Sequence, residues 1–317
     1  MKAITYTKYG PPSVLNLSEI EKPIPKDNEI LIKMMATTVN SGDARLRRAD
    51  PFLVRLMFGF FKPRKQILGN VISGIVQSVG KDVTSFKIGD EVFGLTDMTM
   101  GTYAEYLVVP ELTPLALKPL NTNFEEAAAT VFGGHTALHF LKKADIKPGQ
   151  KILIYGASGA VGSCAVQIAK YYGAEVTAVC STANIELVKN LGADIVIDYT
   201  KQDLSGMEGK FDVVFETVDK TQVSKIAKLV KPSGVLMLGA VIIKGMLQGL
   251  IASKKHNLKL IGGVADVTAS DMNFIKQLIE NKDLKPVIDK TYSLEQMAQA
   301  HEYVDKGHKV GNVVIKI

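Results

Sequence analysis

The sequence is poor in cysteine: 317 residues include only Cys164 and Cys180. So few thiols exclude a disulfide framework and a structural zinc site of four thiolates. Long apolar runs are missing too, because the longest one, residues 235–243, is interrupted by Gly239 and falls short of the roughly 18 residues that span a bilayer. Residues 1–6 predict a short strand rather than a signal peptide. We therefore expect a cytoplasmic protein.

A strong charge of either sign is also absent. The 38 Lys and Arg against 32 Asp and Glu leave a net charge of +6, which is too weak and too dispersed to indicate a nucleic-acid partner. The densest basic stretch, residues 45–65, is interleaved with apolar side chains. It is either a solvated, partly buried excursion, which we favour, or a basic membrane-surface patch. We accordingly expect no membrane partner.

The first part of the chain consists of short alternating segments separated by turn signals. This pattern predicts an antiparallel β domain, with a partly closed barrel as one form of it. The predicted strands are residues 29–34, 71–80, 91–94 and 103–109.

From about residue 123 the pattern changes. Two helical patterns run from 124 to 144, and apolar strands then alternate with helices, which predicts a parallel sheet covered on both faces. The predicted strands are 151–155, 175–180, 195–197, 211–216 and 235–238, and the predicted helices are 162–172 and 184–191. Helical patterns near 268–281 and 294–306 precede a final strand, 312–317.

Residues 156–162, GASGAVG, carry the most informative motif, because they connect a predicted strand to a predicted helix. Small residues there allow a sharp turn and a close approach to a pyrophosphate, which the start of the helix binds. A glycine-rich turn without a ligand is the alternative. The predicted cofactor contacts are Gly156, Ser158, Gly159, Ala160, Val161 and Gly162.

The end of the next predicted strand bears on the choice of cofactor. An NAD site usually places Asp or Glu there, but none occurs between residues 178 and 183. Ser181 and Asn184 favour NADPH over NADH, and Tyr199 is a further candidate that can stack or donate a hydrogen bond. The usual cation beside a 2′-phosphate is missing, with Lys189 closest in sequence.

The order of these parts resembles the medium-chain dehydrogenase/reductase superfamily over essentially the whole chain. Within it, the chain is most similar to the zinc-independent quinone oxidoreductase branch, the zeta-crystallin-like group. The segments that carry the resemblance are residues 39–43 with Arg47, 67–70 with Ser73 and Gly74, 83–94, 101–106, 127–138, the glycine motif and 307–315.

The resemblance implies an α/β protein in which a Rossmann doubly wound parallel sheet is joined to a discontinuous GroES-like β-barrel. The implied domains are 1–123 (GroES-like), 124–264 (Rossmann, NADPH-binding) and 265–317 (return to the GroES-like domain). It also places Thr136 beside the nicotinamide ribose. Gly239 is a further predicted cofactor contact. A homodimer joined through an edge strand near 257–263 is expected.

The resemblance also bears on zinc. Zinc-dependent members have Cys where this chain has Asn40 and His where it has Asn70, with a third ligand near Val131 or Phe132. Such residues are poor zinc ligands, so we expect no metal. His135 and His139, spaced i and i+4, lack a third ligand and are interpreted as packing or surface residues.

Without a metal, the feasible reaction is hydride transfer to an electron-poor small molecule. The leading interpretation is a zinc-independent, NADPH-dependent reductase of quinones or α,β-unsaturated carbonyls. The alternatives are an NADP(H)-binding sensor or structural protein and, less favoured, a metal-free alcohol dehydrogenase or ketone reductase. Asn40 is the candidate polar contact near the acceptor, with capping of a turn before Gly42 as its alternative role, and Tyr103 is a candidate proton donor.

Overall fold

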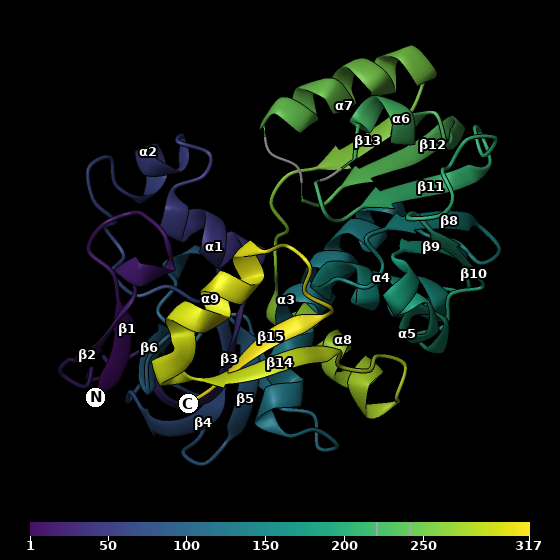
Figure 1. Cartoon of the computed structure of the whole chain (residues 1–317). Coiled ribbons are helices and arrows are strands. Elements are labelled where there is room, and N and C mark those ends of the chain that lie inside the picture. The colour runs from purple at the N-terminus through teal and green to yellow at the C-terminus, as the bar shows by residue number, and fades with distance from the viewer. Residues whose placement is uncertain (220, 241–242) are drawn as a thin grey trace. The chain divides into compact units, whose positions relative to one another are not determined.

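The computed structural model describes residues 1–219, 221–240 and 243–317 (Figure 1). The chain packs into two compact units. Residues 1–132, 267–280 and 286–317 form what we call the β unit, and residues 133–266 with 281–285 form the α/β unit. The limits of the domains implied by the resemblance stay predictions.

The α/β unit is built on a six-stranded parallel sheet. Its strand order, with the first three strands reversed and the next three following in sequence, is that of doubly wound dinucleotide-binding domains. In spatial order the strands are β10 (Ile195–Asp198), β9 (Glu175–Cys180), β8 (Lys151–Tyr155), β11 (Phe211–Glu216), β12 (Val230–Leu238) and β13 (Lys259–Gly262). The predicted Rossmann fold is thereby confirmed.

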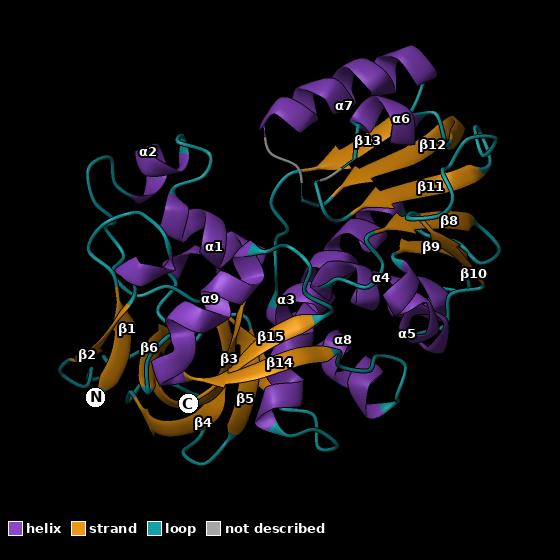
Figure 2. Ribbon diagram, viewed as in Figure 1, coloured by secondary structure: helices purple, strands orange, loops and turns teal. Residues whose placement is uncertain are grey.

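Helices lie against this sheet, as Figure 2 shows. They cover it because its strands are apolar on both faces. Helices α4 (Ala160–Tyr171) and α5 (Ile185–Asn190) pack on the half containing β8, β9 and β10. A short 3-10 turn, η3 (Thr182–Asn184), precedes α5. Helices α6 (Val223–Ala227) and α7 (Ile243–His256) pack on the other half of the sheet.

The β unit is completed by the end of the chain. Strand β15 (Asn312–Lys316) pairs antiparallel with β3 (Glu29–Val39), which confirms that the predicted GroES-like domain is discontinuous. The other strands of this sheet are β14 (Ile288–Ser293), β4 (Val71–Val79), β5 (Glu91–Leu95), β7 (Leu115–Leu117) and β6 (Tyr106–Pro110). A separate pair, β1 (Lys2–Thr5) and β2 (Asn16–Glu19), is antiparallel.

The β unit also contains helices, of which α9 (Met297–Asp305) and α8 (Ala269–Glu280) contact this sheet. Helix α9 packs against both α1 (Ser41–Arg48) and β15. The remaining elements are α2 (Val54–Phe58) and the 3-10 turns η1 (Pro12–Val14), η2 (Asp97–Thr99) and η4 (Leu294–Gln296).

Several predicted elements differ from the structure; β12, for example, begins at Val230 rather than at residue 235. The two helical patterns between 124 and 144 form one continuous helix, α3 (Phe124–Ala144). Position 133, within this helix, requires glycine, because a Cβ there would lie 2.1 Å from the Ala160 carbonyl oxygen. The strand predicted at 103–109 begins only at Tyr106, so Tyr103 precedes β6. Among the described residues, no helix is long and apolar enough to cross a membrane.

Candidate functional site

The glycine loop lies where the strand order of the sheet reverses, between β8 and β11. Gly156 has a φ of 82°, and a Cβ there would lie 2.4 Å from a methyl carbon of Val218. A Cβ on Gly162 would lie 2.1 Å from the Gly156 carbonyl oxygen. Glycine is therefore required at both positions, and in doubly wound sheets this reversal point is where ligands bind.

The start of α4 offers backbone donors to an anion. Gly159 is the N-cap and provides no side-chain cap, and the first turn holds no acidic residue. The first N–H groups of a helix, here those of Ala160, Val161 and Gly162, have no partner within the helix. Together with the positive end of the helix dipole, they fit a pyrophosphate.

An asparagine connects this loop to the end of β9. The Asn184 side-chain amide donates to the Ser158 hydroxyl at 3.0 Å and to the Ser181 hydroxyl at 3.2 Å. Nearby on the sheet, the half-exposed Tyr199 ring stacks on Tyr155 with ring centres 6.4 Å apart. The structure thus brings together Ser158, Ser181 and Asn184, which the sequence placed separately.

Asp198, which the sequence analysis missed, stands next to this group. It ends β10, directly opposite Cys180 in the parallel pairing. Its carboxylate accepts hydrogen bonds from the Thr182 hydroxyl at 2.5 Å and the Thr200 hydroxyl at 2.7 Å. The bond from Thr182 is the main cause that lowers the pKa of Asp198. The sequence could have indicated this position, because neighbouring parallel strands place their last residues side by side, and Asp198 directly follows the strand predicted at 195–197.

A cation that the sequence analysis did not identify also lies near this end of the sheet. The Lys201 ammonium is 4.0 Å from the Asp198 carboxylate, and its side chain is 67% exposed. Lys189, the cation nearest in sequence to Ser181, pairs instead with Glu186 at 3.0 Å. Lys201 thus adds an exposed positive charge at this end of the sheet.

The other two predicted cofactor contacts lie elsewhere in the α/β unit. Gly239 follows β12 and donates its backbone N–H to the Glu216 carbonyl at 2.9 Å, which places it at the carboxyl edge of the sheet. Thr136 is buried in α3, with its hydroxyl 3.3 Å from the His135 ring. Their contacts with a cofactor stay predictions.

In the β unit, Asn40 caps α1. Its side-chain oxygen accepts the Asp43 backbone N–H at 3.1 Å, and the Asp43 carboxylate accepts the Asn40 backbone N–H at 3.0 Å. Because the oxygen of Asn40 is fixed in this way, its amide NH₂ faces Asn70 and donates to the Asn70 side-chain oxygen at 3.0 Å. Asn40 therefore caps a helix, where the alternative role in the sequence was the cap of a turn, and only its amide nitrogen retains a further donor. Its contact with an acceptor stays a prediction.

These residues do not fit a zinc ion. The amide oxygens of Asn40 and Asn70 both accept N–H groups, and Val131 and Phe132 offer no donor atom. Among the residues that the structure describes, no group of three His, Cys, Asp or Glu is arranged to hold a metal. His139 uses its Nδ1 to accept the Asp266 backbone N–H at 3.1 Å.

Tyr103 lies in the core of the β unit. Its ring packs edge-to-face on His301, with ring centres 5.7 Å apart, and both residues are fully buried. Burial and the neighbouring Asp43 raise the pKa of Tyr103 well above its ordinary value. Burial also raises the pKa of Asp43 to about 7, although hydrogen bonds oppose this. Arg47 pairs with Asp305 at 2.5 Å.

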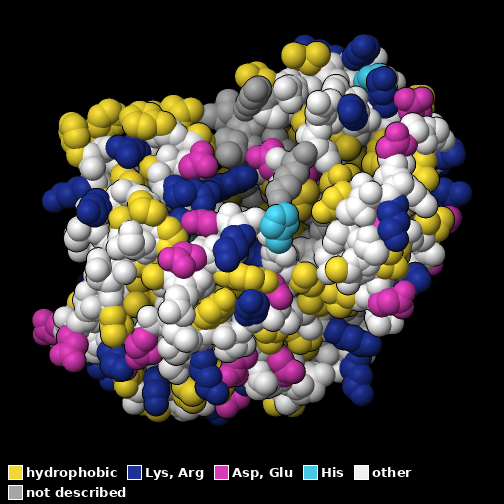
Figure 3. Space-filling model, viewed as in Figure 1, with side chains coloured by type: hydrophobic (Ala, Val, Ile, Leu, Met, Phe, Trp, Pro, Cys, Tyr) yellow, Lys and Arg dark blue, Asp and Glu magenta, His cyan; other side chains and the backbone are white. Residues whose placement is uncertain are grey.

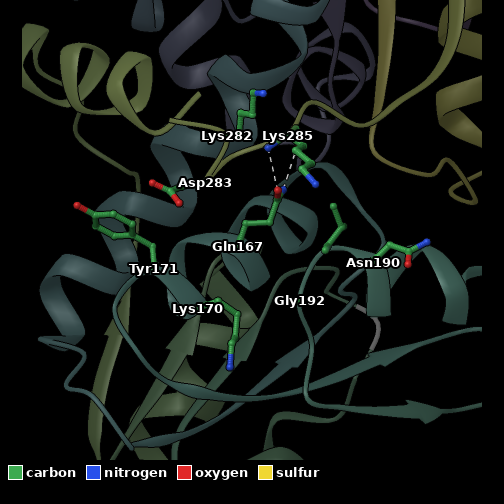
Figure 4. Close-up of a pocket in the computed structure, with 9 residues that line it drawn as sticks. Gln167, Lys170, Tyr171, Asn190, Gly192, Lys282, Asp283 and Lys285 are labelled. Atoms are coloured by element: carbon green, nitrogen blue, oxygen red, sulfur yellow. Dashed lines mark hydrogen bonds between the residues drawn. The ribbon is translucent and has the colours of Figure 1, made fainter. Parts of the chain in front are cut away.

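A separate cavity of about 270 Å³ lies at the far end of α4 (Figure 4). Gln167 stands in its centre and exchanges hydrogen bonds with the Lys285 backbone at 3.1 and 2.8 Å. The glycine loop is at the opposite end of this helix, so the cavity is not part of the dinucleotide site. It is lined by Gln167, Lys170, Tyr171, Asn190, Leu191, Gly192, Lys282, Asp283 and Lys285.

Comparison with known proteins places this geometry in a family. Residues 26–119 match the alcohol dehydrogenase GroES-like domain, and residues 191–315 match the family described as zinc-binding dehydrogenase. The chain is 36% identical to a 2-methylene-furan-3-one reductase of Solanum lycopersicum, covering 99% of this chain and 79% of the relative.

Two further likenesses agree with these matches. The chain is 34% identical to a chloroplastic NADPH-dependent alkenal/one oxidoreductase of Arabidopsis thaliana, again over 99% of this chain and 79% of the relative. The solved quinone oxidoreductase of Coxiella burnetii is 28% identical, with a TM-score of 0.91 over 100% of this chain and 99% of that one. The chain is therefore an oxidoreductase of the medium-chain dehydrogenase/reductase superfamily and belongs to its quinone oxidoreductase branch.

Proposed function

We propose that the protein is a zinc-independent, NADPH-dependent reductase that transfers hydride to a quinone or an α,β-unsaturated carbonyl compound. The observation that carries the proposal is the anion-binding glycine loop joined through Asn184 to Ser181. The relatives named as an alkenal/one oxidoreductase and a quinone oxidoreductase support the same class of acceptor.

The choice of NADPH over NADH rests on the end of β9. Ser181 offers a hydroxyl and no charge, so it does not repel a 2′-phosphate. Asn184 holds this hydroxyl, Tyr199 stands beside the site, and the exposed Lys201 supplies a nearby positive charge. The Asp198 carboxylate already accepts hydrogen bonds from Thr182 and Thr200, so it is less available to accept one from a ribose hydroxyl.

The zinc-free chemistry rests on Asn40 and Asn70. Their amide oxygens already accept hydrogen bonds, so the pair offers N–H donors rather than metal ligands. A bound reduced nicotinamide supplies the hydride. We propose that the remaining N–H of Asn40 donates to the acceptor's carbonyl oxygen, where negative charge develops as hydride arrives.

The proton that completes the reduction is assigned to solvent. The raised pKa of Tyr103 makes its hydroxyl a poor acid, and the side chain is fully buried. The role of Tyr103 as proton donor is accordingly the weaker alternative.

The experiment that tests this function follows NADPH oxidation by the purified protein across quinones, enals, enones, simple ketones and aldehydes. We expect turnover with the first three classes and little with the others. Tight NADPH binding without turnover on any acceptor would instead favour a sensor or structural protein. Turnover confined to simple ketones and aldehydes would favour a ketone reductase, and one zinc per chain by elemental analysis would contradict the zinc-free chemistry.

We further propose a cytoplasmic homodimer. Both cysteines are buried and free, which is compatible with a reducing compartment. Strand β13 ends the described sheet of the α/β unit, so its outer edge is available to pair with a second copy.

A further inference from the structure

The segment around α2 exposes an unusual amount of apolar surface. The exposed fractions are 90% for Phe61, 69% for Met57 and 61% for Leu56, and no residue of α2 is buried. We call the exposed apolar residues of this segment the apolar tip: Phe52, Leu53, Leu56, Met57, Phe60 and Phe61. Figure 3 shows hydrophobic side chains gathered over α2, with Lys and Arg side chains next to them. Contiguous patches of this kind mark interaction sites.

The apolar tip has a defined conformation. The Tyr9 hydroxyl donates to the Gly59 carbonyl at 2.8 Å, and the Arg64 backbone N–H donates to the Phe58 carbonyl at 2.7 Å. The rings of Phe60 and Phe61 meet edge-to-face with centres 5.0 Å apart. The side chains are therefore presented by a closed loop, which reduces the ordering cost of binding.

A basic rim adjoins the apolar tip. Lys62, Arg64 and Lys65 are exposed, and in the described part of the chain they make no ion pair. In the same segment, the Arg55 guanidinium lies over the Tyr9 and Phe52 rings. Asp50 is the only acidic residue in the sequence from 45 to 65. Within this segment the apolar tip is thus flanked by positive charge.

This positive charge distinguishes between the possible binding partners of the apolar tip. A second copy of the chain docking tip to tip would bring the two basic rims together, and such like-charge contacts are costly. A peptide helix needs a groove to receive it, whereas side chains as exposed as Met57 and Phe61 protrude. Protruding Phe, Leu and Met side chains rimmed by Lys and Arg match the surface of an anionic bilayer, which accepts both groups at once.

We propose that the apolar tip and its basic rim dock the protein on the surface of an anionic lipid bilayer. This goes beyond the proposed function and replaces our expectation of no membrane partner. The composition of residues 45–65 is the same whether the segment is buried or exposed, and only the structure shows its exposure. Docking brings the enzyme to the layer in which apolar quinones and enones concentrate.

Co-sedimentation with vesicles tests the docking and needs no turnover, so its result is separate from that of the acceptor assay. The purified full-length protein is mixed with vesicles of phosphatidylcholine alone or of phosphatidylcholine with phosphatidylserine. We expect binding to the anionic vesicles that is at least about tenfold stronger and that weakens as salt is added. Equal binding to both vesicles, or none to the anionic ones, overturns the proposal.

Matched double variants locate the contact. We expect Met57→Ser with Phe61→Ser, and separately Lys62→Glu with Lys65→Glu, to weaken anionic-vesicle binding about tenfold or more. Ile24→Ser with Leu112→Ser is the control, because these side chains are 84% and 92% exposed but lie outside the apolar tip. Thermal unfolding checks that each variant folds.

Two outcomes would reject the apolar tip as the lipid contact. One is an equal loss of binding in the control variant. The other is a change of molar mass in light scattering caused by the Met57→Ser, Phe61→Ser variant, which would make the apolar tip an interface between copies.

Discussion

Ser181 stands where an acidic residue would bind an unphosphorylated ribose, and its hydroxyl accepts a hydrogen bond from Asn184. We predict that Ser181→Asp raises the Kd for NADPH about tenfold, which corresponds to about 1.4 kcal/mol, and leaves the Kd for NADH unchanged or lower. The reason is that the new carboxylate repels a 2′-phosphate and can bind a ribose hydroxyl. Fluorescence titration with both cofactors measures this.

Ser181→Ala is the matched control, since it removes the hydroxyl without adding charge. An equal change in the two dissociation constants of Ser181→Asp would show that Ser181 does not face the 2′ position. The neighbouring Asp198 explains why cofactor choice was hard to derive from the sequence. Asp198 lies opposite Cys180, the residue before Ser181, only through the register of β9 and β10, although 17 positions separate Ser181 and Asp198 in the chain.

His301 is a second residue at this scale, and its buried environment changes how the stability of the protein depends on pH. Burial and the neighbouring Arg47 and Arg48 lower the pKa of its imidazole to about 3, and neither ring nitrogen has a hydrogen-bond partner in the described structure. Below about pH 6.5 the unfolded chain binds a proton at this position that the folded chain does not. His301 therefore makes the free energy of unfolding fall as the pH falls from about 6.5 towards 3.

Asp43 has the opposite effect on how the free energy of unfolding depends on pH. Its pKa of about 7 in the folded protein exceeds that of an unfolded aspartate, so stability from this group falls as the pH rises from about 4 to 7. When the wild type is compared with His301→Phe, the contribution of Asp43 cancels, because both proteins retain Asp43. We predict that between about pH 6.5 and pH 5 the wild type loses about 2 kcal/mol relative to the variant. Urea denaturation at the two pH values measures it, and parallel pH profiles would contradict it.

At the scale of the element, the start of α4 makes different demands on two glycines three residues apart. A Cβ on Gly162 would lie 2.1 Å from the Gly156 carbonyl oxygen, whereas a Cβ on Gly159 meets nothing closer than 3.4 Å. We predict that Gly162→Ala lowers the free energy of unfolding by about 1–3 kcal/mol and weakens dinucleotide binding. Gly159→Ala, the matched control, is expected to cost about 1 kcal/mol or less.

Chemical denaturation of the two variants measures the difference. Equal stability of Gly162→Ala and Gly159→Ala would mean that the loop relaxes around the added methyl group. The spacing of the glycines in the sequence predicted this loop because few residue types fit it.

Other elements were less accessible from the sequence. The parallel strands were predicted because buried strands such as β8 are continuous apolar runs. Strand β6 begins later than predicted, because Tyr103 turns into the core beside His301 instead of extending the strand. The capping box that starts α1 is visible as Asn40 and Asp43, but residues 41–48 include three arginines and few apolar residues, so no apolar periodicity predicts the helix.

At the scale of the whole molecule, the resemblance accounted for most of what could be predicted. The discontinuous β unit follows from the pairing of β15 with β3, a contact between the two ends of the chain that local patterns cannot specify. The exposure of the apolar tip was equally inaccessible, because apolar composition predicts burial by default. Asn40 was identified only through the resemblance, and its fixed amide orientation required the structure.

The oligomeric state is the first prediction at this scale. We expect light scattering to give a mass of two chains, each of 34.4 kDa, because the outer edge of β13 carries unpaired backbone groups that a second copy can pair. A mass of one chain across the concentration range used for activity would refute the dimer.

The central claim concerns where the hydride goes, and NADPH carrying deuterium at the transferred position of C4 tests it most directly. With an α,β-unsaturated ketone as acceptor, we predict one deuterium on the carbon β to the carbonyl of the product, while the α position takes its proton from solvent. Mass spectrometry and NMR locate the label. Deuterium on the carbonyl carbon, or an unlabelled product, would contradict the account.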